Sequence, residues 1–208
     1  MSPIVLDCPF RGQWRAMNSP ARRVPSHGTE LFGTKFAIDF VPVDERGRSA
    51  SYGLRSLFVP EPPEAFVGFG RPILAPISGA VVAAWDTAPD HAAYRGFPSI
   101  GYALTQAQRA RAGWRALAGN SVVIAIAPQG PFVSLVHLKQ GSVRVQAGDF
   151  VEVGQQLGEC GNSGNSTEPH LHLQVNDSTD WARTGAIPMH FRLSRGVSLP
   201  REGELISC

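Results

Sequence analysis

The chain has 208 residues and a formal net charge of +2, and 43% of it is hydrophobic, with 22 glycines and 17 prolines. This length suffices for one domain with a sizeable core, and the many turn residues are typical of a globular protein, which excludes a disordered or coiled-coil chain. The weak positive charge gives no argument for a nucleic-acid-binding protein.

The predicted elements are mostly short strands separated by turns. Residues 1–26 are irregular and are predicted to form an arm that packs across the domain. A loop followed by a strand is predicted from His27 to Val43, and residues 44–70 have the composition of a loop. Further strands are predicted within 72–85, as two short strands about a Ser-Gly turn, and at 121–127, 132–138, 148–153, 155–160, 170–175 and 190–193. This spacing predicts an antiparallel sheet fold, with a hairpin turn at 128–131.

One segment, residues 105–119, predicts a helix inserted among the strands. Thr105 and Gln108 match a capping box, and Gly119 suits the C-terminal cap. The apolar residues of this segment recur at helical spacing, which predicts one buried face. Its three arginines, Arg109, Arg111 and Arg115, either form a basic rim for an anionic polymer or lie on an ordinary solvated face.

Two histidines, His170 and His172, stand on alternate residues just after a turn-rich segment. Alternate side chains of a strand point to the same face, so both imidazoles are predicted to enter one space while Leu171 enters the core. Paired imidazoles can serve a zinc site as ligand and catalytic base. On their own they are also compatible with ordinary surface or hydrogen-bonded histidines.

Three more residues extend this pattern. His137 lies in a predicted strand, and His27 precedes Asp39 by twelve residues. Asp39 stands in the apolar run Phe36–Phe40, where an unpaired charge is expensive and a metal would neutralise it. The alternative for Asp39 is a capping or ion-paired carboxylate.

From about His27 to Val175 the chain resembles the M23 zinc metallopeptidases, the lysostaphin-like or LytM-like peptidoglycan endopeptidases. The shared order of motifs is Val136-His137-Leu138, Gly148-Asp149, Gly154-Gln155, Gly161-Asn162-Ser163-Gly164 and Pro169-His170-Leu171-His172. Upstream, Ser26-His27-Gly28 and Asp39 are further apart than the usual family pattern has them, as in a branch with a longer loop. His91 and His190 match no ligand position and are expected to be structural.

The resemblance implies a mainly all-β fold, a two-layered antiparallel sheet with a metal-binding groove. It also implies that His27, Asp39 and His172 bind Zn²⁺, while His137 and His170 are catalytic without binding it. Three protein ligands leave the fourth tetrahedral position for water, and the other imidazoles can move a proton or stabilise an oxyanion. The implied activity is hydrolysis of short peptide cross-links or stem peptides of bacterial peptidoglycan.

Several alternatives remain open at this stage. Some relatives keep the fold and lose ligands, so a non-catalytic binding or regulatory module is the second hypothesis. A lipoyl-type carrier is disfavoured because no lysine stands at the tip of the Gly-Asp hairpin, and a phosphate loop at 158–165 lacks the required Lys-Ser/Thr. A catalytic Cys160 paired with His137 is less favoured than a buried thiol.

The expected organisation is an arm at 1–26, a single metallopeptidase domain at 27–193 and a tail at 194–208. Three cysteines without paired spacing, Cys8, Cys160 and Cys208, predict no disulfide framework. No apolar run is long enough to span a membrane and the first residues do not resemble a signal peptide, although the implied substrate is extracytoplasmic. The arm could cover the groove, with Asn18 as a reach-over ligand.

Overall fold

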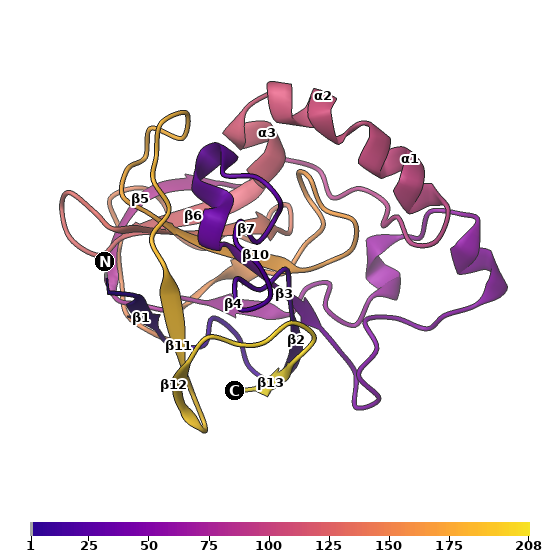
Figure 1. Cartoon of the computed structure of the whole chain (residues 1–208), viewed down its shortest axis with the longest axis horizontal. Coiled ribbons are helices and arrows are strands. Elements are labelled where there is room, and N and C mark those ends of the chain that lie inside the picture. The colour runs from indigo at the N-terminus through magenta and orange to yellow at the C-terminus, as the bar shows by residue number, and fades with distance from the viewer. Residues whose placement is uncertain (1) are drawn as a thin grey trace.

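The computed structural model describes residues 2–208 and is built around one large antiparallel sheet (Figure 1). Its eight strands follow the order β13 (Leu205–Ser207), β2 (Gln13–Met17), β3 (Ile38–Pro42), β10 (Leu171–Asn176), β7 (Phe132–Leu138), β6 (Asn120–Ala125), β5 (Gly79–Trp85) and β8 (Phe150–Val151). The predicted antiparallel, mainly β fold is confirmed, including the β6–β7 hairpin.

Two smaller sheets pack against the large one. The first joins β1 (Ile4–Leu6), β11 (Met189–Leu193) and β12 (Gly196–Ser198), and its β1–β11 pair is parallel. The second pairs β4 (Pro72–Leu74) with β9 (Gln156–Glu159). The hydrophobic core lies between these layers and includes Leu6, Phe40, Ile73, Leu157 and Phe191.

Strand β10 is buried on both faces, and its two faces differ in chemistry. Leu171, Leu173 and Val175 belong to the hydrophobic core. The alternate residues, His172 among them, are polar and equally buried. Because side chains alternate along a strand, the polar residues of β10 face the layer on the other side of the sheet from the hydrophobic core. That layer holds the 3₁₀ segment η1 (Leu31–Phe36), which contacts β10.

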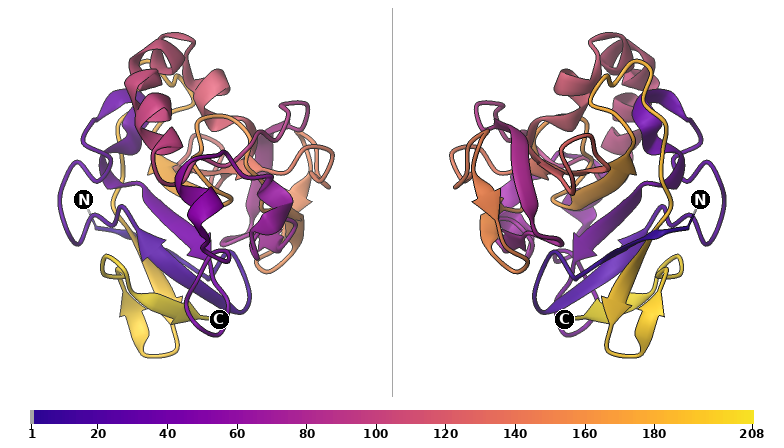
Figure 2. Two further views of the ribbon diagram at one scale, coloured as in Figure 1. Left: turned by 90° about the vertical axis from the view of Figure 1, so that its right-hand side faces the viewer. Right: turned by 90° about the vertical axis from the view of Figure 1, so that its left-hand side faces the viewer.

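The predicted helix at 105–119 is wrong in its extent. Two short helices, α2 (Gln106–Arg111) and α3 (Trp114–Ala118), divide this region, and a third, α1 (Pro98–Leu104), precedes it. Gly113 has φ +86°, which separates α2 from α3. The predicted capping box is also wrong, since the Thr105 side chain caps no helix. Gly119 does end α3, with φ +63°. The helices lie beside η1 at one end of the molecule (Figure 2).

Two of the three arginines in this segment are engaged within the chain. The Arg109 guanidinium lies 3.7 Å from the centre of the Tyr102 ring and donates to Asn165, and that of Arg115 lies 4.2 Å from the centre of a Trp85 ring. Of the three arginines considered for a basic rim, Arg111 is exposed and is not among those two. Two other 3₁₀ segments, η2 (Leu54–Leu57) and η3 (Pro63–Ala65), lie in the 44–70 loop.

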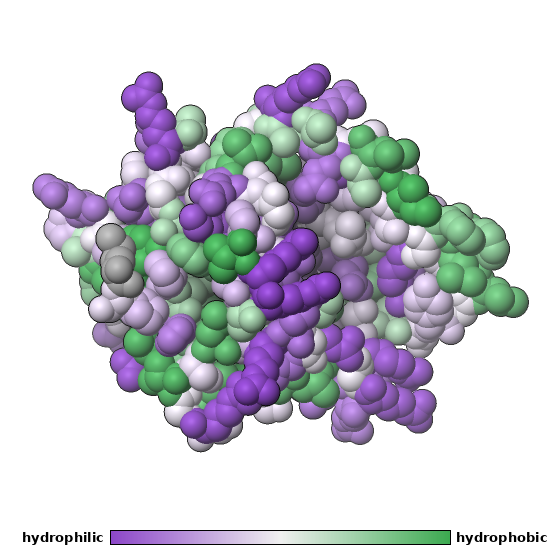
Figure 3. All heavy atoms as spheres, in the orientation of Figure 1, coloured by the Kyte–Doolittle hydropathy of each residue, from purple (hydrophilic) through white to green (hydrophobic). Residues whose placement is uncertain are grey.

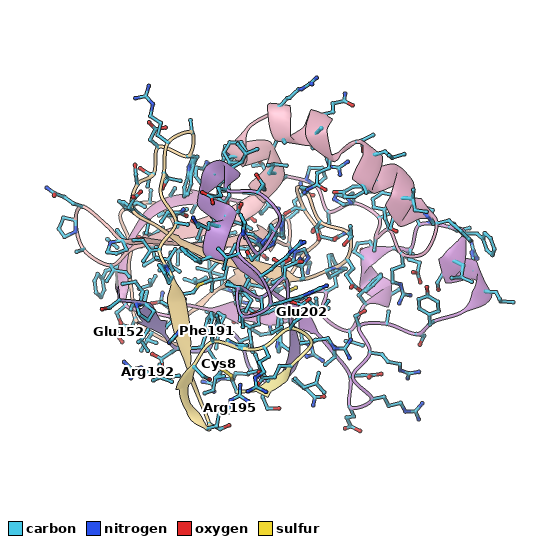
Figure 4. The ribbon with its side chains drawn as sticks, in the orientation of Figure 1. Cys8, Glu152, Phe191, Arg192, Arg195 and Glu202 are labelled. Carbon is cyan, nitrogen blue, oxygen red and sulfur yellow. A yellow bond between two sulfur atoms is a disulfide. The ribbon has the colours of Figure 1, made fainter. Side chains whose placement is uncertain are left out.

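Both ends of the chain contribute to the sheets. The segment expected as an arm contains β1 and β2, and that expected as a tail contains β12 and β13, which pairs with β2. A disulfide joins Cys8 to Cys208, so the prediction of no disulfide is wrong. Cys8 Sγ lies 4.0 Å from the carbonyl oxygen of Arg192 on β11 (Figure 4). Cys160 is free and buried in the core, and burial raises the pKa of its thiol, which argues against a nucleophile.

The surface is mixed in character. On the face in Figure 3, hydrophilic residues cross the centre, and hydrophobic residues gather on the right, over the α1 end of the molecule. The exposed apolar residues of that end include Leu54, Phe58, Phe97 and Leu104. Within residues 2–208, none of the helices has the length and hydrophobicity needed to cross a bilayer.

The disulfide is expected to stabilise the fold strongly. A cross-link between residues 200 positions apart lowers the conformational entropy of the unfolded chain. On the loop-entropy model this stabilises the folded state by up to about 5 kcal/mol. Cys8→Ser should therefore lower the urea midpoint of unfolding, and Cys208→Ser should lower it equally. The double variant is the control and should be no less stable than either single one. Unchanged midpoints after reduction of the wild type would contradict this expectation.

Candidate functional site

The site is assembled by the pairing of three adjacent strands. In the β3–β10 register Asp39 lies opposite His172, and in the β10–β7 register His172 lies opposite Val136. His27 comes from the loop before η1. The five predicted site residues are thereby brought to one cavity of about 360 Å³, which they line together: His27, Asp39, His137, His170 and His172.

The Asp39 carboxylate is at the centre of the cluster. His27 Nε2 lies 3.1 Å from Asp39 Oδ2, and His172 Nδ1 lies 2.9 Å from Asp39 Oδ1. Asn18 also donates to Oδ2 through its amide, at 2.7 Å. Burial opposes ionisation of this carboxyl, but the charges and hydrogen bonds of the neighbouring histidines outweigh it and hold its pKa well below the ordinary 3.8.

The second ring nitrogen of each of these histidines also has a partner. The Ser26 hydroxyl donates to the carbonyl of Thr34, at 3.2 Å, and its oxygen lies 2.9 Å from His27 Nδ1. For His172, Nε2 lies 3.0 Å from the side-chain oxygen of Gln174. Without a cation, the nitrogens that face Asp39 can donate to its carboxylate; with a cation beside Asp39, the hydrogens lie on His27 Nδ1 and His172 Nε2, and the nitrogens that face Asp39 offer their lone pairs.

Three potential ligand atoms therefore converge in a buried space. One ligand atom from each of His27, Asp39 and His172 lies within 4.8 Å of the others. Mutually facing lone pairs repel one another unless a cation or a proton lies between them. Two imidazoles and one carboxylate, each held by further hydrogen bonds, are a donor set that fits Zn²⁺. These three residues could hold a metal, as predicted for them.

His137 is positioned by a bulge in its strand. The β6–β7 register shifts between Asn120 and Ser121, which pair with Leu138 and Val136, so His137 is the extra residue. Its φ is +66°, a left-handed conformation that is costly for a residue other than glycine. Bulges redirect side chains in this way. The His137 Nδ1–H donates to the carbonyl of Ser163 at 2.9 Å, which leaves Nε2 as an acceptor.

His170 is held in the same manner at the start of β10. Its Nδ1 donates to the carbonyl of Glu168 at 2.8 Å, and Ser166 Oγ lies 3.0 Å away. Its Nε2 is 3.7 Å from Asp39 Oδ1, which is beyond hydrogen-bond distance. The rings of His137 and His170 lie with centroids 4.8 Å apart. Both imidazoles thus border the three potential ligand atoms without joining them.

Burial affects the chemistry of His137 directly. Loss of solvation, reinforced by the nearby His170 and His172, lowers the pKa of His137 well below 6.5. The ring is therefore neutral near pH 7 and its Nε2 can accept a proton. A neutral ring with a free acceptor nitrogen is one requirement for a general base.

The cavity has two walls of different origin. One is formed by η1 and the loop before it, including Leu31 and Phe32, and the other by the helical segment, including Tyr102, Gln106 and Trp114. Among the described residues that line it, Arg23 is the one arginine or lysine and Asp39 the one carboxylate. A groove with so few charged side chains suits a peptide ligand that is itself largely uncharged.

The remaining histidines lie apart from this cluster. His91 contacts two carbonyl oxygens, of Ala92 and Gly164, each at 2.9 Å. His190 is on β11, in the separate three-stranded sheet. Sequence reasoning missed Gln174 and considered Asn18 only as a metal ligand. The spacing His172-x-Gln174 could have indicated that glutamine, because alternate strand residues share a face.

The model of peptidase family M23 matches residues 99–183, which include His137, His170 and His172 but not His27 or Asp39. Lysostaphin of Staphylococcus staphylolyticus is 34% identical over 95 residues, which are 45% of this chain and 19% of that protein. The glycyl-glycine endopeptidase ALE-1 of Staphylococcus capitis is 33% identical over 95 residues, 45% of this chain and 26% of its own length.

Among solved structures, the deep-sea M23 metalloprotease pseudoalterin superposes with a TM-score of 0.48 and 12% identity, over 99% of this chain and 94% of that one. The chain thus aligns with about a fifth to a quarter of the two curated relatives and with nearly all of pseudoalterin.

The low pKa of His137 predicts a pH-dependent stability. Below pH 6.5 an unfolded chain binds a proton at His137 before the folded chain does, so the unfolding free energy falls as pH falls towards the folded pKa. The slope is at most about 1.4 kcal/mol per pH unit. In urea titrations at pH 7.5, 6.5 and 5.5 with chelator present, wild type should lose stability relative to His137→Gln. Parallel pH curves for the two proteins would show that the pKa is not lowered.

Proposed function

We propose that this chain is a member of peptidase family M23 and a zinc-dependent endopeptidase that hydrolyses peptide bonds of bacterial peptidoglycan. The observation that carries the proposal is the convergence of three potential ligand atoms, on His27, Asp39 and His172, beside two imidazoles that are held apart from them.

The three converging residues would hold the metal. When bound there, Zn²⁺ polarises a scissile carbonyl and lowers the pKa of a bound water. Asp39 contributes the one negative charge of the set, and its low pKa keeps it ionised at neutral pH. The two histidine ligands are each fixed through their other ring nitrogen, by Ser26 and by Gln174.

The two remaining histidines would move the proton. His137 and His170 each donate Nδ1–H to a backbone carbonyl and so offer Nε2 to the cavity as an acceptor. A proton taken up at Nε2 makes that nitrogen a donor, which can then stabilise an oxyanion or protonate a leaving amine. One ring would act as base and the other would face the developing oxyanion.

The proposed substrate is a peptide with small or uncharged side chains. One relative is named a glycyl-glycine endopeptidase, and three alanines, Ala103, Ala110 and Ala118, stand among the larger side chains that line this cavity. A short cross-link or stem peptide of peptidoglycan meets this description. The Cys8–Cys208 disulfide favours an oxidising, extracytoplasmic compartment, where such a substrate is found.

Three consecutive residues provide the test, since each should give a different phenotype. His172→Ala should lose both zinc and activity, whereas His170→Ala should keep zinc and lose at least about 100-fold in turnover. Leu171→Asp should unfold the protein, because it places a charge in the core. Zinc is measured by mass spectrometry, turnover by digestion of purified cell wall with sequencing of the products, and folding by circular dichroism.

The histidine variants also have a matched control. His190→Ala removes an imidazole from a strand outside the site and should leave zinc content and turnover unchanged. If His170→Ala lost zinc and His172→Ala kept it, His170 would be the metal ligand and His172 the catalytic residue. Normal digestion by both would favour the non-catalytic binding module instead.

A further inference from the structure

Three polar residues follow one face of β10, and the last two, Gln174 and Asn176, have no part in the proposed chemistry. Together with His172 they occupy alternate positions, so their side chains share a face. Gln174 and Asn176 are fully buried. Buried amides need hydrogen-bond partners, and here the partners determine how each amide is turned.

The orientation of Asn176 is fixed by two backbone carbonyls. Its Nδ2 donates to the carbonyl of Gly33 at 3.2 Å and to that of Gly185 at 3.3 Å. A carbonyl can only accept, so the amide nitrogen must face them. The side-chain oxygen of Asn176 is thereby turned towards its neighbour on the strand.

Gln174 is fixed in the same way. Its Nε2 donates to the carbonyl of Phe32 at 2.9 Å and to Oδ1 of Asn176 at 2.7 Å. Its side-chain oxygen must then face His172 Nε2, at 3.0 Å. The other ring nitrogen, Nδ1, lies 2.9 Å from Oδ1 of Asp39, so both nitrogens of His172 face an acceptor. When Nδ1 binds a cation, the hydrogen of the ring lies on Nε2 and is donated to Gln174.

The carbonyls that anchor this series come from a strained part of the cavity wall. Phe32 and Gly33 both have left-handed backbones, with φ of +57° and +69°. A Cβ atom on Gly33 would collide with Nδ2 of Asn176. The segment η1 therefore adopts its kink in close contact with the two amides, and Phe32 itself lines the cavity.

We infer that Gln174 is a positioning residue, which holds the His172 ring with Nδ1 towards Asp39 and joins that proposed ligand to the η1 wall of the cavity through Phe32 and Asn176. The inference deepens the proposed function, on which its metal-binding part rests. Its prediction for the position of the His172 ring in the metal-free protein is independent of zinc. Partners that orient a ligand histidine in this way typically change metal affinity by about 10–100-fold when they are removed.

The experiment compares two substitutions of Gln174. Gln174→Met removes the acceptor for His172 at similar volume, whereas Gln174→Glu keeps an oxygen for it and loses the amide donor to Phe32. The first readout is the crystal structure of the metal-free protein, which shows the position of the His172 ring relative to Asp39. The second is the zinc dissociation constant, measured by competition with a chromophoric chelator.

In wild type the His172 ring should lie between Asp39 and Gln174. Gln174→Met should show a displaced or rotated ring and a zinc dissociation constant raised about 10–100-fold, and Gln174→Glu should restore both properties towards wild type. Ser134→Ala is the matched control, because Ser134 pairs with Gln174 across the strands and its buried hydroxyl has no hydrogen-bond partner among residues 2–208. It should change neither readout.

Three outcomes would overturn the inference. The first is a wild type whose His172 ring is turned away from Gln174, which is decisive even if a variant does not fold. The second is a Gln174→Met variant that matches wild type or has the same effects as Gln174→Glu. The third is an effect of Ser134→Ala as large as theirs, since it would show a role in packing alone. A wild type that has the ring in this position but binds no zinc would instead refute the proposed function and leave the positioning role standing.

Discussion

The Asp39 carboxylate is a negative charge buried beneath three imidazole rings, and the arrangement of the surrounding strands depends on satisfying it. An unpaired charge at this depth would cost several kcal/mol. The β3–β10 register supplies His172 opposite Asp39, while Asn18 and His27 approach from the segments before β3. A slip of one residue would turn His172 into the core and an apolar side chain towards the cavity, so the charge and the register require each other.

The same alternation gives β10 two separate tasks. Its leucines and valine complete the hydrophobic core, while its polar residues form a continuous hydrogen-bonded series that ends at backbone carbonyls of η1. Since neither face meets water, the polar residues cannot exchange their partners for solvent. The proposed metal ligand His172 and the η1 wall of the cavity therefore belong to one hydrogen-bonded unit. The opposite wall, made of short helices interrupted by glycine, is joined to this unit by fewer interactions of this kind.

What the sequence predicted was local, and what it missed depended on distant contacts. The strands around His137 and His170 could be predicted because alternation and turn residues lie within a few positions. The convergence of His27 and Asp39 with His172 came from a family resemblance, since no periodicity links positions so far apart. The single helix failed because Gly113 adopts a conformation that ends α2 early. Strands β2 and β13 are held mainly by pairing with their neighbours, and Gln174 has no sequence signal apart from its spacing.

The bridge between Cys8 and Cys208 gives the molecule the connectivity of a closed ring. Every residue of the site lies within that ring. If a foreign protease cleaved one exposed loop, such as that around Glu45, the ring would open without releasing a fragment, and both new ends would remain attached to the sheet. Two separate cuts would be needed to release a piece. In surroundings rich in hydrolases, this connectivity would let a nicked molecule remain assembled around its site.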